Sequence, residues 1–489
     1  MNKLVSIEMK KVFKHKSIYI IYLVIFAFCL LNYFLYKNDY DSNGFYKYEV
    51  EDDLVKYVKK LELDNKKYDV NKDSDKSIFV TNKTKIDIAR IRMKYDVNDW
   101  RYIKAKDYLY ECIYDYNYYK YIVGNFSNAN FNMENYNDRL LKFKKNDWLF
   151  FAKEERAKIK DDIVKLDNYI SNTNDVEEIK KLNLEKKNLN NKLLIVNYRI
   201  NKKINYSNTF LNKAVINYED NIDAIDDNKI IKRIDYQQKI KKQEEIRNHY
   251  INKYIIDNKI NIDKVNTLNY QLRTIVDDYE FFIILIILVV SGILICEEFN
   301  KGTIKLLLIK PYSRNQILIS KLVACFYMFL LTIIFIFLSH LFIGGILFGF
   351  SSLKNGVIVY DFNLHKLLKI NIFVYVLLRI VVKMPMFLII IIISFIFGII
   401  LNSTVGSFAI TMIIYSFSEV INKLAIDYNL KFMKYFITLN WNLKDYLFGG
   451  ISLYQFLDCK KSILILLFYG IILVGILFLS FNNKNIKNI

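Results

Sequence analysis

The charged segment 297–321, between two long apolar runs, contains the residues whose types and spacing point most clearly to a function. Glu297 and Glu298 end the first of these runs, where charged side chains would mark the boundary with water. Gly302 allows a sharp reversal of the chain. Thr303 can then cap a short helix by accepting a hydrogen bond from a backbone N–H of its first turn. The segment therefore begins with a turn into a new, short helix.

The second half of this segment ends the short helix and starts another. Pro311 ends the helix expected over 304–310, because proline cannot continue a helical hydrogen-bond ladder. Ser313 and Gln316 have the spacing of a capping box, so a new helix begins here. The prediction is helix, turn, short helix, turn and helix at a membrane surface, an arrangement suited to docking a soluble partner. An ordinary solvated connector is the alternative, as is pairing of Glu297, Glu298 and Arg314 with one another.

Apolar runs on both sides must position this segment in a membrane. Several exceed or approach the roughly 18 apolar residues that mark a spanning helix, and backbone groups in hydrocarbon must pair within the segment. We expect about six spanning helices, with 366–383 as an interfacial lead-in to the fourth. Their expected bounds are 17–37, 280–296, 322–350, 384–401, 404–421 and 462–481.

The insertion after the first span, 38–279, is polar and large enough to fold around its own core. Apolar residues follow helical spacing on both sides of a turn-like stretch at 172–175, which predicts an antiparallel hairpin of coiled-coil character. A further helix is expected across 229–256, and 40–150 stays unassigned, with some strands possible. The predicted fold class is an all-α polytopic membrane protein with a large, mainly helical extracellular domain.

Composition and motif content exclude several classes of function. The chain has 489 residues, is 53% hydrophobic and 25% charged, and carries a formal net charge of +20. Its basic residues are dispersed among acids, so lysines flanking membrane helices explain the charge and nucleic-acid binding is not expected. Phosphate-cradling loops, HExxH and GxSxG are absent, and the five cysteines are far apart. We therefore expect neither an enzyme nor a metal site.

Ionisable residues inside the spans are the remaining candidates. Arg379 and Lys383 are four residues apart and share one helix face. They either extend to the headgroups or form a cationic edge of a transport path, with Glu419 as a candidate partner. His340 is expected to be a packing residue, with a ligand or proton-carrying role as the alternative.

The residues of the charged segment resemble the cytoplasmic loop of type-2 ABC exporter permeases. In that family an acidic pair is followed by Lys-Gly-Thr, a Leu-rich turn, Pro-x-Ser-Arg and a Lys at the next span. The N-terminal pattern is similar too, as is the Asn402-Ser403 break between two spans, so the resemblance covers 1–37 and 280–481. The matching residues are Glu297, Glu298, Lys301, Gly302, Thr303, Leu306, Leu307, Pro311, Ser313, Arg314 and Lys321 in the loop, and Glu8, Lys11, Lys14, Lys16 and Ser17 at the N-terminus.

The resemblance implies a permease subunit in a bacterial cell membrane that binds no cofactor itself. ATP and Mg would be bound by separate ABC ATPase subunits, and a second permease would complete a homo- or heterodimer. The cargo would be a peptide, a drug or another amphipathic molecule, antimicrobial peptides included. A different hypothesis is a membrane-anchored surface receptor or sensor that uses the insertion for recognition.

The first span has a basic flank, which favours cytoplasmic termini and an external insertion. Residues 2–15 have apolar positions at helical spacing, typical of an interfacial helix, with a disordered basic leader as the alternative. The expected parts are 1–16 (cytoplasmic interfacial helix), 17–37 (first span), 38–279 (extracellular domain), 280–481 (five spans, with the coupling loop 297–321 and outer loops 351–383 and 422–461) and 482–489 (cytoplasmic tail).

Overall fold

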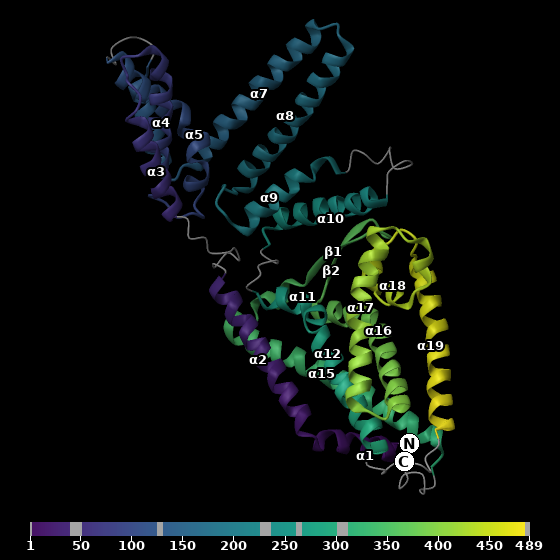
Figure 1. Ribbon diagram of the computed structural model, residues 1–489. Helices are drawn as coiled ribbons and strands as arrows, with labels where there is room; N and C mark the ends of the chain where they lie inside the picture. Colours follow the sequence, from purple (N-terminus) through teal and green to yellow (C-terminus); the bar gives the residue numbers. More distant parts are fainter. Residues whose placement is uncertain are drawn as a thin grey trace. The chain divides into compact units, whose positions relative to one another are not determined.

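The computed structural model describes residues 2–39, 51–124, 131–224, 236–260, 267–300 and 312–484, and these are mostly helical. The chain divides into two compact units (Figure 1). One unit, the membrane unit, comprises 1–38, 230–247 and 265–489, and the other, the insert unit, comprises 39–229 and 248–264. The predicted fold class is confirmed.

The insert unit is built from helices and has its own apolar cores, one of them around Trp100, Phe143 and Phe151. Strands considered possible in its first part are not found: the described residues there form helices and a short π-helical turn at Tyr119–Val123. Helices in this unit, some of which extend beyond it, are α3 (Glu51–Asn65), α4 (Asp73–Arg92), α5 (Trp100–Tyr118), α6 (Met133–Lys144), α7 (Trp148–Asn172), α8 (Val176–Lys202), α9 (Phe210–Asp220) and α10 (Tyr236–Asn258).

The predicted hairpin is confirmed, with α7 and α8 lying side by side (Figure 1). Ile159 and Leu166 of α7 are buried, as the apolar spacing predicted. Asp175 caps α8 by accepting a hydrogen bond from the backbone N–H of Glu177 at 2.9 Å. The turn therefore lies between Asn172 and Val176, in the expected stretch.

The membrane unit contains six helices that are long and apolar enough to cross a membrane. At one end they extend beyond the predicted bounds by up to twelve residues, the most in the fourth span, because charged and polar residues at the ends remain helical; the third span ends two residues before its predicted end. These spans are Lys16–Asp39 (α2), Glu280–Phe299 (α12, η5 and part of α13), Arg314–Phe348 (α15), Ile372–Leu401 (α16), Thr404–Asp427 (α17) and Cys459–Asn483 (α19).

The second span is the centre of this unit. In its most apolar stretch 67% of the residues are buried, against 17% in α17 and α19. It begins as α12 (Glu280–Ser291), passes through a π-helical turn, η5 (Gly292–Cys296), and ends in α13 (Glu297–Asn300). The first helix, α1 (Asn2–Lys14), lies at the end of this unit where α19 also ends (Figure 1).

Two expected boundaries in this unit are wrong. The region 351–371, expected to be a loop, contains an antiparallel hairpin of β1 (Val357–Asp361) and β2 (Lys366–Ile370). The expected interfacial lead-in 366–383 does not exist as a separate element, since α16 runs unbroken from Ile372 through Pro385 to Leu401. The charges of this region suggested an interface, but they are paired inside the protein, as described below.

The boundary of the insertion is also wrong. Helix α11 (Leu268–Asp278), expected to belong to the insertion, groups with the spans. Its apolar face is buried, with Leu268 and Leu272 fully enclosed. Shorter helical elements of the membrane unit are η6 (Ser351–Asn355), η7 (Lys431–Tyr435), α18 (Ile437–Asn440) and η8 (Leu443–Gly449).

Candidate functional site

Helix α1 carries a carboxylate on its buried face. Leu4, Val5, Glu8 and Val12 are all buried, and their spacing of about one turn places them on the same side of the helix. Glu8 has no exposed surface. A buried carboxylate is costly unless it is paired, so this helix requires cationic partners from the spans.

Those partners form the N-terminal charge network, which consists of Glu8, Lys11, Glu298 and Lys321. Lys321, in α15, is fully buried and lies 2.6 Å from Glu298 and 3.2 Å from Glu8. Lys11 pairs with Glu298 and lies 3.1 Å from Glu8. Burial alone would lower the pKa of Lys11, but Glu298 and Glu8 outweigh it and raise that pKa above its ordinary value. Two cations and two anions therefore neutralise one another in the protein interior.

The network joins α1 to both sides of the predicted coupling loop. Glu298 lies near the start of that loop, 297–321, and Lys321 is its last residue, within α15. His15 adds a contact to Glu297, with His15 Nε2 3.4 Å from a carboxylate oxygen. All four members had been singled out in the sequence as motif residues of two separate segments, and the structure brings them together.

The start of α15 is fixed in two further ways. The predicted capping box is confirmed: Ser313 Oγ accepts from Gln316 N at 3.2 Å, and Gln316 Oε1 accepts from Ser313 N at 3.0 Å. Arg314 donates to the carbonyl oxygen of Asn482 at the end of α19, at 2.6 Å. The predicted mutual pairing of Arg314 with Glu297 and Glu298 is thus not found in the described structure. The predicted coupling residues Gly302, Thr303, Leu306, Leu307 and Pro311 lie outside the described residues.

A second group, the α11–α16 charge network, consists of Asp277, Glu280, Arg379 and Lys383. Lys383 is buried and lies 2.5 Å from Asp277, and it also pairs with Glu280. Arg379 pairs with Asp277. Tyr415 of α17 donates its hydroxyl to Glu280 at 2.9 Å. Burial tends to raise the pKa of the Asp277 carboxyl, but Lys383 and Arg379 outweigh it and hold that pKa below its usual range.

This network corrects one prediction. In the described structure the ion pairs of Arg379 and Lys383 are to Asp277 and Glu280, and the predicted partner Glu419 is not among them. The two cations shared one helix face as expected, but they bind acids of α11 and α12 instead of extending to headgroups. Because each positive charge is matched, an unpaired cationic edge is absent at these two residues.

The two networks occupy opposite ends of the central span. Glu280 and Glu298 are eighteen residues apart in one helical run. At about 1.5 Å per residue this run is roughly 27 Å long. The hydrocarbon core of a bilayer is about 30 Å thick, so the run that separates the two networks is about long enough to cross it.

His340 is buried and packs against two tyrosine rings. Its Nδ1 lies 3.1 Å from the hydroxyl oxygen of Tyr33 in the first span. The rings of Tyr33 and Tyr279 lie 5.3 and 5.0 Å from the His340 ring. Within the described residues no group of His, Cys, Asp and Glu side chains is arranged to hold a metal ion.

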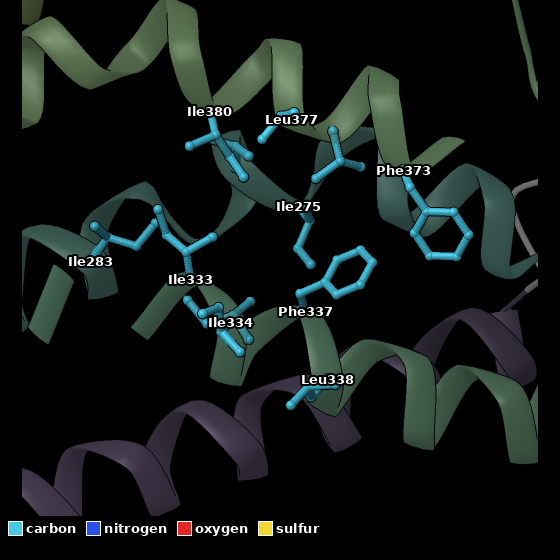
Figure 2. Close-up of a pocket in the computed structure, with 12 residues that line it drawn as sticks. Ile275, Ile283, Ile333, Ile334, Phe337, Leu338, Phe373, Leu377 and Ile380 are labelled. Atoms are coloured by element: carbon cyan, nitrogen blue, oxygen red, sulfur yellow. The ribbon is translucent and has the colours of Figure 1, made fainter. Parts of the chain in front are cut away.

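An apolar cavity of about 240 Å³ lies beside the α11–α16 charge network. Figure 2 shows Ile275, Ile333 and Ile380 converging on it from α11, α15 and α16. Its other lining residues are also aliphatic or phenylalanine, and three of them, Ile334, Leu338 and Leu377, are more than half exposed at the surface of the unit. The cavity therefore opens toward the surface that lipid would cover.

Sequence reasoning missed Asp277 and Glu280. Both flank Tyr279 at the start of an apolar run, where an acid is ordinarily a boundary marker. Charge pairing was the available signal, because two cations within a span require two acids at the same depth. Asp277, Asp278 and Glu280 lie at or just before the start of the second span, at a matching position.

These features define a multi-pass helical membrane protein whose spans are joined by buried ion pairs. A family model described as "Protein of unknown function (DUF2705)" matches residues 239–487, so the chain belongs to this family. The uncharacterized protein YhcI of Bacillus subtilis (strain 168) is 44% identical over 63 residues, which are 13% of this chain and 20% of that protein. The chain thus spans about a fifth of the length of the curated relative it matches. No solved structure matches.

Proposed function

We propose that this chain is the membrane permease subunit of an ATP-driven exporter. It would work with separate ABC ATPase subunits, which bind ATP and Mg, and with a second permease. The observation that carries the proposal is the N-terminal charge network. It ties Glu298 and Lys321, one near each end of the predicted coupling loop 297–321, to Lys11 and Glu8 of α1.

A force applied to the loop would be transmitted to α1 and the spans through buried ion pairs. The loop joins α13 to α15, and both flanks share buried ion pairs with α1. Separating these charges in a buried site is costly, so α1 and the second and third spans would move as one body. An ATPase that displaced the loop would therefore move three helices together.

The cargo we propose is amphipathic. The cavity of about 240 Å³ offers aliphatic and aromatic walls to an apolar group, and it lies next to paired charges on α11 and α16. A polar group of the same molecule could exchange for one of these pairs. In this arrangement the termini are cytoplasmic and the insert unit is external.

The direct test is recovery of the partner. The tagged chain is purified in mild detergent from its own cells after crosslinking, and the co-purified proteins are identified. We expect a P-loop ATPase, and we expect Leu306→Asp with Leu307→Asp to abolish its recovery. Leu184→Asp is the matched control, because Leu184 is 61% exposed and lies on the hairpin of the insert unit. Recovery of the chain without an ATPase, or recovery unchanged by the loop variants, would refute the proposal.

A receptor or sensor is the second candidate, because the insert unit has its own cores and forms a separate compact unit. In that case the loop variants would leave the function intact. Removing the insert unit would abolish the response. Under the exporter hypothesis the loop variants abolish cargo efflux from cells, so efflux in Leu306→Asp distinguishes the two.

A further inference from the structure

A polar cavity of about 450 Å³ lies in the insert unit, where α8 meets α5, α7 and α9. This volume falls in the range of small-molecule sites, roughly 300–1,000 Å³. Five of the side chains that line it carry a charge: Lys104, Glu155, Lys192, Arg199 and Glu219. The site takes no part in the proposed coupling function and stands independently of it.

Arg199 is the central feature of the cavity. Its exposure is 4%, and it belongs to α8 near the point where that helix ends at Lys202. Its Nη1 donates to Asn212 Oδ1 at 2.6 Å and to the carbonyl oxygen of Asn205 at 3.3 Å. Its guanidinium carbon lies 4.5 Å from the centre of the Tyr206 ring. These contacts hold the guanidinium in one place.

Among the described residues Arg199 forms no ion pair within 4 Å of a carboxylate, and its hydrogen bonds go to Asn205 and Asn212. Burial lowers the pKa of its guanidinium, and the nearby Tyr206, Glu219, Tyr108 and Glu155 raise it by less, so the positive charge is only partly compensated. Buried charges in proteins are ordinarily paired. The fork of N–H donors on a guanidinium matches a carboxylate in bidentate geometry. The cavity beside Arg199 is therefore suited to a ligand carboxylate.

Two acids line the same cavity. Glu155 Oε2 accepts hydrogen bonds from the hydroxyls of Tyr108 and Tyr206, at 2.8 and 2.7 Å. Burial raises the pKa of Glu219, and none of the described ion pairs or hydrogen bonds involves its carboxylate. A cation placed beside Glu219 would relieve this cost. The cavity can thus offer an anion to a ligand ammonium group as well as a cation to a carboxylate.

The remaining wall is apolar. Ile195 and Val196 of α8 are buried at 3% and 4% exposure, and Ile216 of α9 is 45% exposed. An aliphatic side chain of a ligand would bury further surface there, worth about 25 cal/mol per Å². Lys192 is exposed at the cavity and adds positive charge near its opening.

We propose that this cavity binds an amino acid or short peptide with free ends and an aliphatic side chain. Arg199 takes the carboxylate, Glu219 takes the ammonium group, and Ile195 with Val196 takes the side chain. Each charged group of the ligand faces a side chain of opposite charge, and its aliphatic side chain faces apolar residues. Binding involves no covalent step.

The test uses the full-length chain in nanodiscs and isothermal titration calorimetry with the dipeptide Leu-Leu, its C-terminal amide and its N-acetyl form. We expect Leu-Leu to bind, and we expect amidation to weaken binding at least about tenfold, the loss of one charge-assisted interaction. Arg199→Gln should bind the amide and the free acid equally. Glu219→Gln should lose discrimination against the acetylated form. Arg90→Gln is the control, because Arg90 is exposed in the same unit and pairs with Glu62.

Several results would overturn the proposal. One is absence of Leu-Leu binding by the unaltered chain up to about 10 mM. Another is equal affinity of the unaltered chain for the free acid and the amide. If Arg199→Gln does not fold, Arg199→Lys and Glu219→Gln test the proposal in its place, since none of the described hydrogen bonds involves the Glu219 carboxylate. Unchanged discrimination in a folded Glu219→Gln chain would also refute it.

Discussion

Replacing Lys321 by methionine tests whether the N-terminal charge network holds α1 to the spans. The ammonium group of Lys321 is fully buried and serves both Glu8 and Glu298, at 3.2 and 2.6 Å. Its removal leaves two carboxylates with Lys11 as their cation, so the formal charge of the network changes from zero to −1. Breaking a buried pair in this way costs about 3–5 kcal/mol.

The apparent melting temperature in detergent is the assay, since large proteins commonly unfold irreversibly. At about 2 °C per kcal/mol, a value typical of larger domains, Lys321→Met should lower it by roughly 6–10 °C. Lys14→Met, an exposed lysine at the end of α1, is the matched control and should change little.

A second variant isolates the electrostatic part. Glu8→Gln combined with Lys321→Met restores a formal charge of zero, with Lys11 and Glu298 left as a pair. The double variant should therefore be more stable than the sum of the two single effects predicts, by a coupling of about 0.5–3 kcal/mol. Additive effects, or a Lys321→Met chain as stable as Lys14→Met, would show that the network does not stabilise this contact.

Three further predictions concern other parts of the membrane unit. Asp277→Asn should lower the apparent melting temperature at neutral pH. The folded pKa of Asp277 is held below 3.8, so the stability that its charge contributes is complete above pH 3.8 and is lost as the pH falls through the folded pKa. The difference in melting temperature between the two chains should therefore disappear below about pH 4. Gly344→Ala should lower the stability by about 1–3 kcal/mol, because the new methyl group would meet the Tyr33 side chain and displace it from His340. The control Gly475→Ala, whose new methyl group meets no atom within 4 Å, should leave the melting temperature unchanged in the same thermal assay. Ser313→Ala should cost about 1 kcal/mol by removing the cap of α15, and a loss of zero would mean that Arg314 alone fixes that end.

The sequence predicted the elements well where one physical signal dominated. Apolar runs located all six spans, because burial of backbone in hydrocarbon leaves helix as the solution for an uncharged run. The α7–α8 hairpin followed from apolar spacing, and the capping box from Ser313 and Gln316. Each of these signals is local, so neighbouring residues in sequence were sufficient.

Errors arose where residues distant in sequence compensate one another. Arg379, Lys383 and Pro385 made 366–383 look like an interface, yet Asp277 and Glu280, about a hundred residues earlier, neutralise the two cations inside α16. The β1–β2 hairpin was missed because Lys366 and Lys369 interrupt its apolar pattern. Pairing across such distances depends on tertiary structure, which no local pattern contains.

The two networks also differ in their relation to the family. The region matched by the family model, 239–487, contains every member of the α11–α16 charge network together with Glu298 and Lys321. Glu8 and Lys11 lie outside that region, on α1. Lys321 and Glu298 can neutralise each other alone, so the spans are electrically balanced without α1. Glu8 and Lys11 likewise lie within 3.1 Å of each other, which balances α1 by itself. Because each half is neutral alone, docking of α1 on the spans buries no net charge, whereas loss of any single member of the network strands one.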